Sequence, residues 1–255
     1  MHRSRIHDKI YIFDVDGTLT PSRQKMTEEF RNFFKEWSSE NIFYLVTGSD
    51  LPKMQEQVED DILEKAAGIF TCCGNQFWKE GPTKQWPTDW RLVYENKFKP
   101  PKDLIDFLWD KVNNSMCPIR IGNHIEDRNS MLNFSVVGRD CTQEQREEYY
   151  EWDNKEGERR DISRAIGFRW PELDAVIGGQ ISIDIYPKGY DKSQILEHIE
   201  DIEEKYCPNK YIFIGDRTEK GGNDYPLTKL MVDKSFRDFY QTDGPEKTME
   251  ILKSL

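Results

Sequence analysis

Two aspartates lie two residues apart at the end of a short apolar segment near the amino terminus. Asp14 and Asp16 follow the apolar run at residues 9–13 and precede Gly17 and Thr18. Residues two apart in a strand face the same way, so both carboxylates can point into one cleft. Such a pair repels unless a divalent cation neutralises it, or unless its protonation states are split between a nucleophile and a general acid/base. An ordinary turn with solvated acids is the alternative for this pattern taken alone.

A serine and a lysine stand where a phosphate site would need them. Ser49 follows the apolar run 42–46 and precedes a predicted helix, so its hydroxyl and the neighbouring amides can hold phosphate oxygens. Taken alone, an N-cap role for Ser49 or Asp50 is the better interpretation. Lys192 is predicted in the first turn of a helix, where the helix dipole disfavours a cation, and this position indicates an anion nearby. A solvated surface lysine is the alternative.

A third group of polar residues follows the apolar run at residues 211–214. Asp216 closes this run, and Asn223 and Asp224 follow within one glycine-rich loop. Their oxygens are ligands of the kind that Mg²⁺ prefers, although Asp216 could instead be a turn or N-cap residue. Acids, a serine and a lysine at the ends of several elements together predict a site more strongly than any one of them does.

These residues are positioned by apolar segments whose periodicity alternates between strand and helix. Such alternation predicts a parallel sheet covered by helices, an α/β core of Rossmann type. The predicted strands are residues 9–13, 42–46 and 211–214, and the helical stripes lie within residues 30–37, 54–62 and 195–202.

The middle of the chain has a different pattern. Residues 131–137 and 181–186 alternate with period two, as strands with one wet face do. Between them, residues 142–164 are densely charged and predict a mostly solvent-facing helix. We therefore predict an inserted α+β cap domain with an antiparallel sheet over residues 87–187, with hinges at 81–87 and 187–189. Residues 1–86 and 188–255 then form the catalytic core.

Composition excludes several classes of protein. The 255 residues include 36 basic and 47 acidic ones, a net charge of −11, which argues against a general nucleic-acid or membrane-surface binder. No apolar run approaches the ~18 residues of a membrane-spanning helix, and the first ten residues lack the core of a signal peptide. Five cysteines without CxxC spacing signal neither disulfides nor zinc, so we expect a cytoplasmic protein.

The order of the polar motifs resembles the haloacid dehalogenase-like phosphotransferase superfamily. This resemblance implies that Asp14 is the nucleophile that attacks phosphorus and that Asp16 is the general acid/base. It also implies that Ser49 and Lys192 hold phosphate. The implied Mg²⁺ ligands are Asp14, the backbone carbonyl of Asp16, and Asp216, with Asn223 and Asp224 behind them.

The middle segment resembles the cap of eukaryotic-type phosphomannomutases. The resemblance is carried by residues 128–135, 138–139, 146 and 178–184, and residues 18–25 after the catalytic acids share it. Arginines in an acidic chain can supply a second anion site, because guanidinium forks match phosphate oxygens. Salt bridging with nearby glutamates, in the helix and in the hairpin, is the alternative for Arg128, Arg139 and Arg146. A half-exposed strand is the alternative for Ser182 and Asp184. The residues that the resemblance assigns to sugar-phosphate contacts are Arg23, Arg128, Arg139, Arg146, Ser182 and Asp184.

These features together predict a Mg²⁺-dependent mutase that interconverts mannose 1-phosphate and mannose 6-phosphate. A hexose 1,6-bisphosphate activator would phosphorylate Asp14, and sugar phosphates would be the partners of the chain. A sugar-phosphate phosphatase of the same superfamily is the alternative, since water at the same aspartyl phosphate gives hydrolysis. A binding protein with a vestigial site is disfavoured. The resemblance further implies a homodimer through the cap and a role in GDP-mannose synthesis.

The chain departs from the family pattern in two places. Residues 71–75 read Thr-Cys-Cys-Gly-Asn where the family usually has a Glu-Asn-Gly turn, and Ser130 replaces a glycine in the cap motif. We expect these changes to affect sugar preference and closure. Cys72 and Cys73 are predicted to be buried small side chains without a catalytic role.

Overall fold

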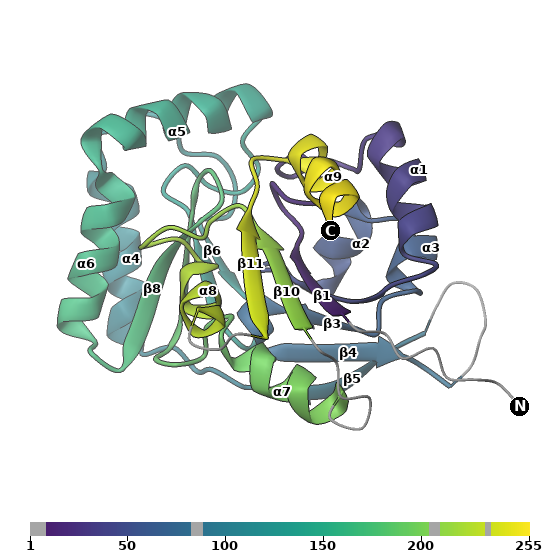
Figure 1. Ribbon diagram of the computed structural model, residues 1–255. Coiled ribbons are helices and arrows are strands. Elements are labelled where there is room, and N and C mark those ends of the chain that lie inside the picture. The colour runs from purple at the N-terminus through teal and green to yellow at the C-terminus, as the bar shows by residue number, and fades with distance from the viewer. Residues whose placement is uncertain (1–8, 83–88, 204–209, 233–235) are drawn as a thin grey trace, which may run out of the picture. The chain divides into compact units, whose positions relative to one another are not determined.

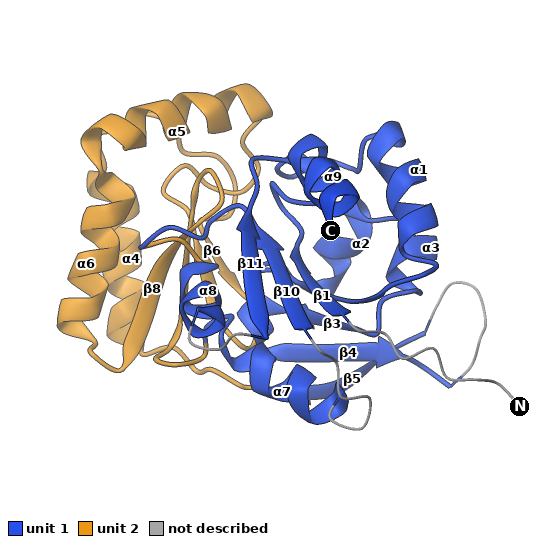
Figure 2. Ribbon diagram, in the orientation of Figure 1, with its two compact units in different colours: residues 1–95, 191–220, 224–255 blue, residues 96–190, 221–223 orange. Residues whose placement is uncertain are grey.

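The computed structural model describes residues 9–82, 89–203, 210–232 and 236–255 and divides into two compact units (Figure 2). The first unit contains the residues up to 95 together with 191–220 and 224–255. The second contains residues 96–190 and 221–223. No helix in the described ranges is long and apolar enough to cross a membrane.

The first unit is built on a mixed sheet with the strand order β11-β10-β1-β2-β3-β4-β5. Strands β11, β10, β1, β2 and β3 are parallel, whereas β4 and β5 are added in antiparallel orientation. The loops that follow β1, β2, β3 and β10 therefore meet at one edge of the sheet. The strands are β1 (Lys9–Asp14), β2 (Ile42–Val46), β3 (Gly68–Thr71), β4 (Gln76–Glu80), β5 (Trp90–Glu95), β10 (Lys210–Gly215) and β11 (Arg237–Gln241).

Helices cover both faces of this sheet (Figure 1). One face packs against α1, α2, α3 and α9, and the other packs against α7 and α8. This arrangement confirms the predicted α/β core. The helices are α1 (Glu28–Trp37), α2 (Leu51–Gln57), α3 (Asp60–Leu63), α7 (Gln194–Glu203), α8 (Tyr225–Met231) and α9 (Pro245–Ser254), with the 3₁₀ turn η1 (Cys72–Gly74) after β3.

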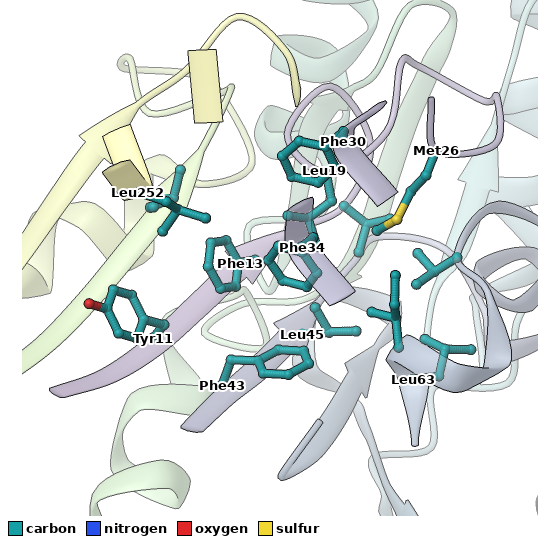
Figure 3. Packing of buried hydrophobic residues seen from close by; sticks show 14 of the residues in the cluster. Tyr11, Phe13, Leu19, Met26, Phe30, Phe34, Phe43, Leu45, Leu63 and Leu252 are labelled. Atoms are coloured by element: carbon teal, nitrogen blue, oxygen red, sulfur yellow. The ribbon is translucent and has the colours of Figure 1, made fainter. Parts of the chain in front are cut away.

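The aromatic stripe of α1 forms the centre of one core (Figure 3). Thr27 begins the helix by accepting a hydrogen bond from the backbone N–H of Phe30. The ring of Phe34 lies 5.3 Å from that of Phe13 on β1 and 5.4 Å from that of Phe43 on β2, both in edge-to-face geometry. Helix α1 is thereby fixed across the two strands that end at the predicted site.

Two local predictions in the first unit were wrong. The helix expected over residues 54–62 is broken at Val58, whose backbone is extended, because the carbonyl of Gln57 accepts from the N–H of Met26 instead. Lys192 does not lie in the first turn of a helix, since α7 begins at Gln194. The end of α2 at Gln57 and the start of α7 after Lys192 each leave a side chain beside the aspartates described below.

The second unit is an antiparallel sheet with the order β6-β7-β9-β8, covered by helices. Its elements confirm the predicted α+β architecture with an antiparallel sheet. They are α4 (Lys102–Asn114), β6 (Ile125–Asp127), β7 (Leu132–Phe134), α5 (Gln143–Glu156), α6 (Glu158–Arg169), β8 (Leu173–Gly178) and β9 (Ser182–Pro187).

The strand register gives this sheet one polar and one apolar face. Glu126 pairs with Asn133, which pairs with Asp184, so these side chains form a row on one face. The neighbouring row of Phe134 and Ile183 lies on the opposite face, in the core that includes α4, α5 and α6. Helices α4, α5 and α6 therefore pack on the apolar face of the sheet.

The charged segment of the second unit also differs from its prediction. It forms two helices rather than one, because Gly157 adopts a left-handed conformation with φ 75° between α5 and α6. A buried ion pair of 2.7 Å between Arg159 and Asp153 joins the two helices. Tyr149 and Ile162 are buried in the core, whereas most of the other residues of the segment are exposed or partly exposed, as expected.

The limits of the compact units differ from those of the predicted domains. The expected start of the inserted domain at residue 87 and most of its first hinge lie outside the described residues. Strand β5 pairs with β4 in the first sheet, so the second unit begins at Asn96, and it extends to Tyr190. The assignment of residues 87–187 to a substrate-specificity domain stays a prediction.

We predict that Phe34→Ala destabilises the protein by about 3–5 kcal/mol, because it leaves a cavity among rings that are fully enclosed. Phe33→Ala is the matched control, since Phe33 is only partly buried and should cost clearly less. Urea unfolding followed by circular dichroism measures both. Equal losses for the two variants would contradict the packing described here.

Candidate active site and anion site

Three carboxylates meet at the carboxyl ends of β1 and β10. Asp14 is the last residue of β1, Asp216 follows β10, and Asp224 is the residue before α8. Each offers an oxygen atom, and these oxygens lie within 4.8 Å of one another. Because β1 and β10 are adjacent and parallel, their polar ends are brought together by the sheet itself.

Lys192 supplies a positive charge inside this carboxylate cluster of Asp14, Asp216 and Asp224. Its Nζ lies 2.5 Å from Oδ1 of Asp14 and 2.6 Å from Oδ1 of Asp224, and the side chain is fully buried. The sequence-based alternative of a solvated lysine is therefore wrong. The turn before α7 delivers the ammonium to the cluster from a distant part of the chain.

Two cations lie near the three carboxylates: the buried ammonium of Lys192 and the more exposed guanidinium of Arg217, whose Nε is 3.7 Å from Oδ2 of Asp216. They do not balance the negative charge, and the carboxylate pKa values are raised. Burial raises the pKa of Asp14 well above its usual range against the opposing charge of Lys192, and the carboxylates of Asp224 and Asp216 raise it further. Burial, followed by the charge of Asp224, raises the pKa of Asp216 to about 7. Burial alone would lower the pKa of Lys192, but the two paired carboxylates outweigh it and raise that pKa.

The loop after β1 is shaped to admit Asp216. Gly17 has a φ of 78°, and a Cβ at this position would lie 2.6 Å from Oδ2 of Asp216. Only glycine satisfies both the left-handed conformation and the close approach. Thr18 donates to Oδ2 of Asp14 over 3.4 Å, and its own carbonyl accepts from the hydroxyl of Thr248 in α9 over 2.8 Å. The C-terminal helix therefore fixes the loop.

The carboxylate cluster fits a divalent cation. It gathers hard oxygen ligands, it is largely buried, and its negative charge exceeds what Lys192 neutralises. The side-chain oxygen of Asn223 is buried without a hydrogen-bond partner among the described residues, but residues 221–223 belong to the second compact unit. The roles of Asn223 and of the Asp16 carbonyl as ligands stay predictions.

Asp16 is held by two donors. Its Oδ1 accepts from Nε2 of Gln57 and from the backbone N–H of Arg23, each over 2.8 Å. Sequence reasoning missed Gln57 because it expected an unbroken helix there. Arg23 has a φ of 61°, an uncommon conformation for a residue other than glycine, and its backbone rather than its side chain makes this contact.

Ser49 lies after β2, the strand beside β1, and is buried. Its N–H donates to Oγ1 of Thr47 and its carbonyl accepts from the N–H of Cys72 over 2.9 Å. The N–H of Cys73 donates to the carbonyl of Thr47, so the two turns are bonded together. Asp50 caps α2 by accepting from Lys53, which is the alternative role considered for it.

The cysteines occupy a strained turn. Cys72 and Cys73 have φ values of 52° and 58° and are fully buried free thiols, as predicted. The carbonyl of Cys73 accepts from the side chain of Gln194, and that of Gly74 accepts from the Tyr94 hydroxyl. This turn therefore supports the Ser49 loop through its backbone.

The second unit gathers four of the predicted sugar-phosphate residues on its polar side. Arg139 donates through Nη1 to the Ser182 hydroxyl over 2.7 Å, and Arg146 donates to the carbonyl of Arg139 over 3.2 Å. Oε2 of Glu126 lies 2.7 Å from Nη2 of Arg128 and 3.4 Å from Nε of Arg139. The three arginines, Ser182 and Glu126 are called the arginine site below.

Asp184 lies on the same face, in the cross-strand row of Glu126 and Asn133. Its Oδ1 accepts from Nδ2 of Asn133 over 2.6 Å. Sequence reasoning missed both Asn133 and Glu126. The available signal was strand alternation, since Asn133 lies between the inward-facing Leu132 and Phe134. The contacts of the polar side with a sugar phosphate stay predictions.

Comparison with known proteins decides the family. A model of the eukaryotic phosphomannomutase family matches residues 26–255. The chain belongs to this family. It is 39% identical over 228 residues to a phosphomannomutase of Encephalitozoon cuniculi, covering 88% of this chain and 86% of that one. A phosphomannomutase of Arabidopsis thaliana is 35% identical and covers 88% of each chain, and a probable phosphomannomutase of Caenorhabditis elegans is 32% identical and covers 96% and 94%.

Solved structures share the fold of this phosphomannomutase-family chain. A phosphatase of the haloalkanoate (HAD) enzyme superfamily from Bacteroides thetaiotaomicron superposes with a TM-score of 0.58 at 14% identity, covering 100% of this chain and 97% of that one. An IMP-nucleotidase of Plasmodium falciparum gives a TM-score of 0.59 at 17% identity and covers 96% of this chain. The chain spans 66% of that nucleotidase's length. At these identities the likeness concerns the fold alone.

We predict that Mg²⁺ stabilises the protein more at about pH 8 than at about pH 6, because a cation needs the deprotonated Asp216. In the metal-free protein the pKa of Asp216 is about 7, above its value in the unfolded chain. The protonated group therefore favours folding at low pH, and this contribution is lost as pH rises through about 7. The Mg²⁺-induced change in Tm at both pH values measures the effect.

Asp216→Asn is expected to remove the pH dependence of the Mg²⁺ effect and most of the effect itself. Asp161→Asn, an exposed aspartate of α6, serves as the control and should behave as the unaltered protein. Equal Mg²⁺ stabilisation at the two pH values would contradict the role of Asp216.

Proposed function

We propose that this chain is a Mg²⁺-dependent phosphomannomutase, an isomerase that interconverts mannose 1-phosphate and mannose 6-phosphate. The observation that carries the proposal is the buried contact of 2.5 Å between Asp14 and Lys192 within the carboxylate cluster. A carboxylate held beside a lysine and a cation site can accept a phosphoryl group whose charge would otherwise repel it. Membership of the eukaryotic phosphomannomutase family supplies the substrate class.

Asp14 is the proposed nucleophile. One of its oxygens faces the Lys192 ammonium and the other faces the Thr18 hydroxyl, so the carboxylate has a fixed orientation. Attack on a phosphorus of the activating hexose 1,6-bisphosphate forms an aspartyl phosphate and breaks the bond between that phosphorus and the sugar oxygen, so that a hexose monophosphate leaves. Bound Mg²⁺, held by Asp14, the Asp16 carbonyl and Asp216, would supply charge stabilisation of the phosphoryl oxygens.

Asp16 is the proposed general acid and base. It gives a proton to the departing sugar oxygen, and it takes a proton from the sugar hydroxyl that attacks the aspartyl phosphate. Gln57 and the backbone N–H of Arg23 bond the same carboxylate oxygen, so the proton is delivered from a fixed position. Ser49 and Lys192 would hold the transferring phosphate.

The arginine site would hold the phosphate that is not reacting. A mutase needs such a site because its bisphosphate intermediate carries two phosphates and only one reacts at a time. Arg128 and Arg139 have side chains only 2% and 6% exposed, which strengthens their attraction for an anion. Arg23, Arg146, Ser182 and Asp184 would complete the contacts with the sugar phosphate.

A sugar-phosphate phosphatase is the second candidate. The solved structures that share the fold include a phosphatase and a hydrolase of the HAD superfamily, and water at an aspartyl phosphate gives hydrolysis. The altered turn at Cys72 and Cys73 bears on this choice, because it supports the loop of Ser49.

Several further assignments belong to this proposal. We infer that residues 87–187 form the cap domain, which sets substrate specificity, and that residues 1–86 and 188–255 form the catalytic core. We infer a homodimer through the cap, a cytoplasmic location and a role in GDP-mannose synthesis. Family membership supports the pathway and the dimer, and the buried free thiols support a reducing compartment.

The proposal predicts that mannose 1-phosphate, Mg²⁺ and a catalytic amount of hexose 1,6-bisphosphate yield mannose 6-phosphate without matching release of free phosphate. Both products are followed in one reaction. Asp14→Asn is expected to abolish both, because no acceptor for the phosphoryl group remains. Free phosphate without the isomer would identify a phosphatase, and full activity of Asp14→Asn would refute the nucleophile.

A second prediction separates the two functions by their need for the arginine site. Arg139→Gln should lower kcat/KM for the mutase at least about 100-fold, because a buried charged contact with the spectator phosphate is lost. Hydrolysis of a small phosphate ester, which carries no second phosphate, should change far less. Arg164→Gln, an exposed arginine of α6, is the matched control. Parallel losses of both activities would argue against a separate anion site.

A further inference from the structure

A carboxylate lies inside the arginine site, and the proposed reaction gives it no role. Oε2 of Glu126 is 2.7 Å from Nη2 of Arg128 and 3.4 Å from Nε of Arg139. These are the donor groups that the proposed function gives to phosphate. A negative charge on them competes directly with the ligand.

The position of Glu126 follows from the sheet register. Glu126 is two residues before Arg128 and pairs across the sheet with Asn133, on the polar face that also carries Asp184. Its side chain is 19% exposed, whereas those of Arg128 and Arg139 are almost fully buried. Without a ligand, buried guanidinium groups repel each other and lack solvent, so a fixed counter-charge keeps them in place.

Arg139 does not depend on Glu126 alone for its position. Its Nη1 donates to the Ser182 hydroxyl over 2.7 Å, and its backbone N–H donates to the carbonyl of Asn123 over 2.8 Å. Loss of the charge on Glu126 would therefore leave the guanidinium of Arg139 anchored in the site. The charge of Glu126 and the placement of Arg139 can be separated by experiment.

We propose that Glu126 is an internal counter-ion of the arginine site. It is a positioning residue that holds Arg128 and Arg139 and must yield their N–H groups each time a phosphate binds. The inference rests on the proposed function and deepens it. A mutase must exchange the two phosphates of its intermediate between the two sites in every cycle, so an arginine site that binds phosphate too tightly would trap the intermediate.

The test is Glu126→Gln in the full chain with Mg²⁺ present. Glutamine keeps the size of the side chain and an oxygen acceptor for the arginines but removes the charge. Calorimetric titration with inorganic phosphate is expected to show about tenfold tighter binding. In the mutase reaction, KM for mannose 1-phosphate and kcat are both expected to fall, because phosphate leaves the site more slowly.

Three further variants assign the effect. Glu126→Asp keeps the charge. Its affinity for phosphate should stay within about twofold of that of the unaltered protein, which is small beside the tenfold effect. Glu151→Gln removes an exposed charge from α5 and should change neither binding nor kinetics. In the double variant Glu126→Gln/Arg139→Gln the tightening should disappear, because the gain requires the arginine.

Unchanged or weaker phosphate binding by Glu126→Gln would overturn the inference, since a merely structural loss cannot increase affinity. If Arg139→Gln weakens phosphate binding while Glu126→Gln does not tighten it, only the role of Glu126 fails. If Arg139→Gln has no effect on phosphate binding, both the role of Glu126 and the arginine site of the proposed function are refuted.

Discussion

A single buried ammonium faces three carboxylates, and the first unit is organised around that shortage of positive charge. Lys192 bonds Asp14 and Asp224, while Asp216 completes the cluster from the end of β10. Burial makes the excess negative charge costly, so it must be relieved by protons or by a divalent cation. The fold meets this constraint with parallel strands that end together, a glycine that admits Asp216, and a helix that fixes the loop through Thr18.

The two units carry opposite local charges in a chain whose net charge is −11. Carboxylates dominate the site of the first unit and arginines dominate that of the second, and each also contains charge of the other sign. Lys192 lies among the aspartates, and Glu126 lies between two arginines. A sugar phosphate carries its charge at one end and hydroxyl groups elsewhere. In the proposed reaction, local charge of this kind, rather than the overall charge, would attract and orient it.

The sequence by itself determined the family, the α/β core and the identity of most charged residues at both sites. This was possible because strand and helix periodicities are local and because polar residues at the ends of parallel strands converge at one edge of the sheet. Asp14, Lys192 and Asp224 were each identified from their position after or before an apolar run, and the structure places them in contact. The cap motif likewise indicated Arg139 and Ser182, which are hydrogen bonded.

Only the tertiary structure decided which partners hold these groups. Gln57 reaches Asp16 because its helix breaks at Val58, and Glu126 reaches two arginines through strand register and the loop that carries Arg139. Two further features could be seen only in the structure. The charged segment is split at Gly157, and β5 pairs with the first sheet. These features depend on hydrogen bonds between residues far apart in the chain, or on the conformation of a single residue. Composition and periodicity report neither the distant hydrogen bonds nor the single conformation.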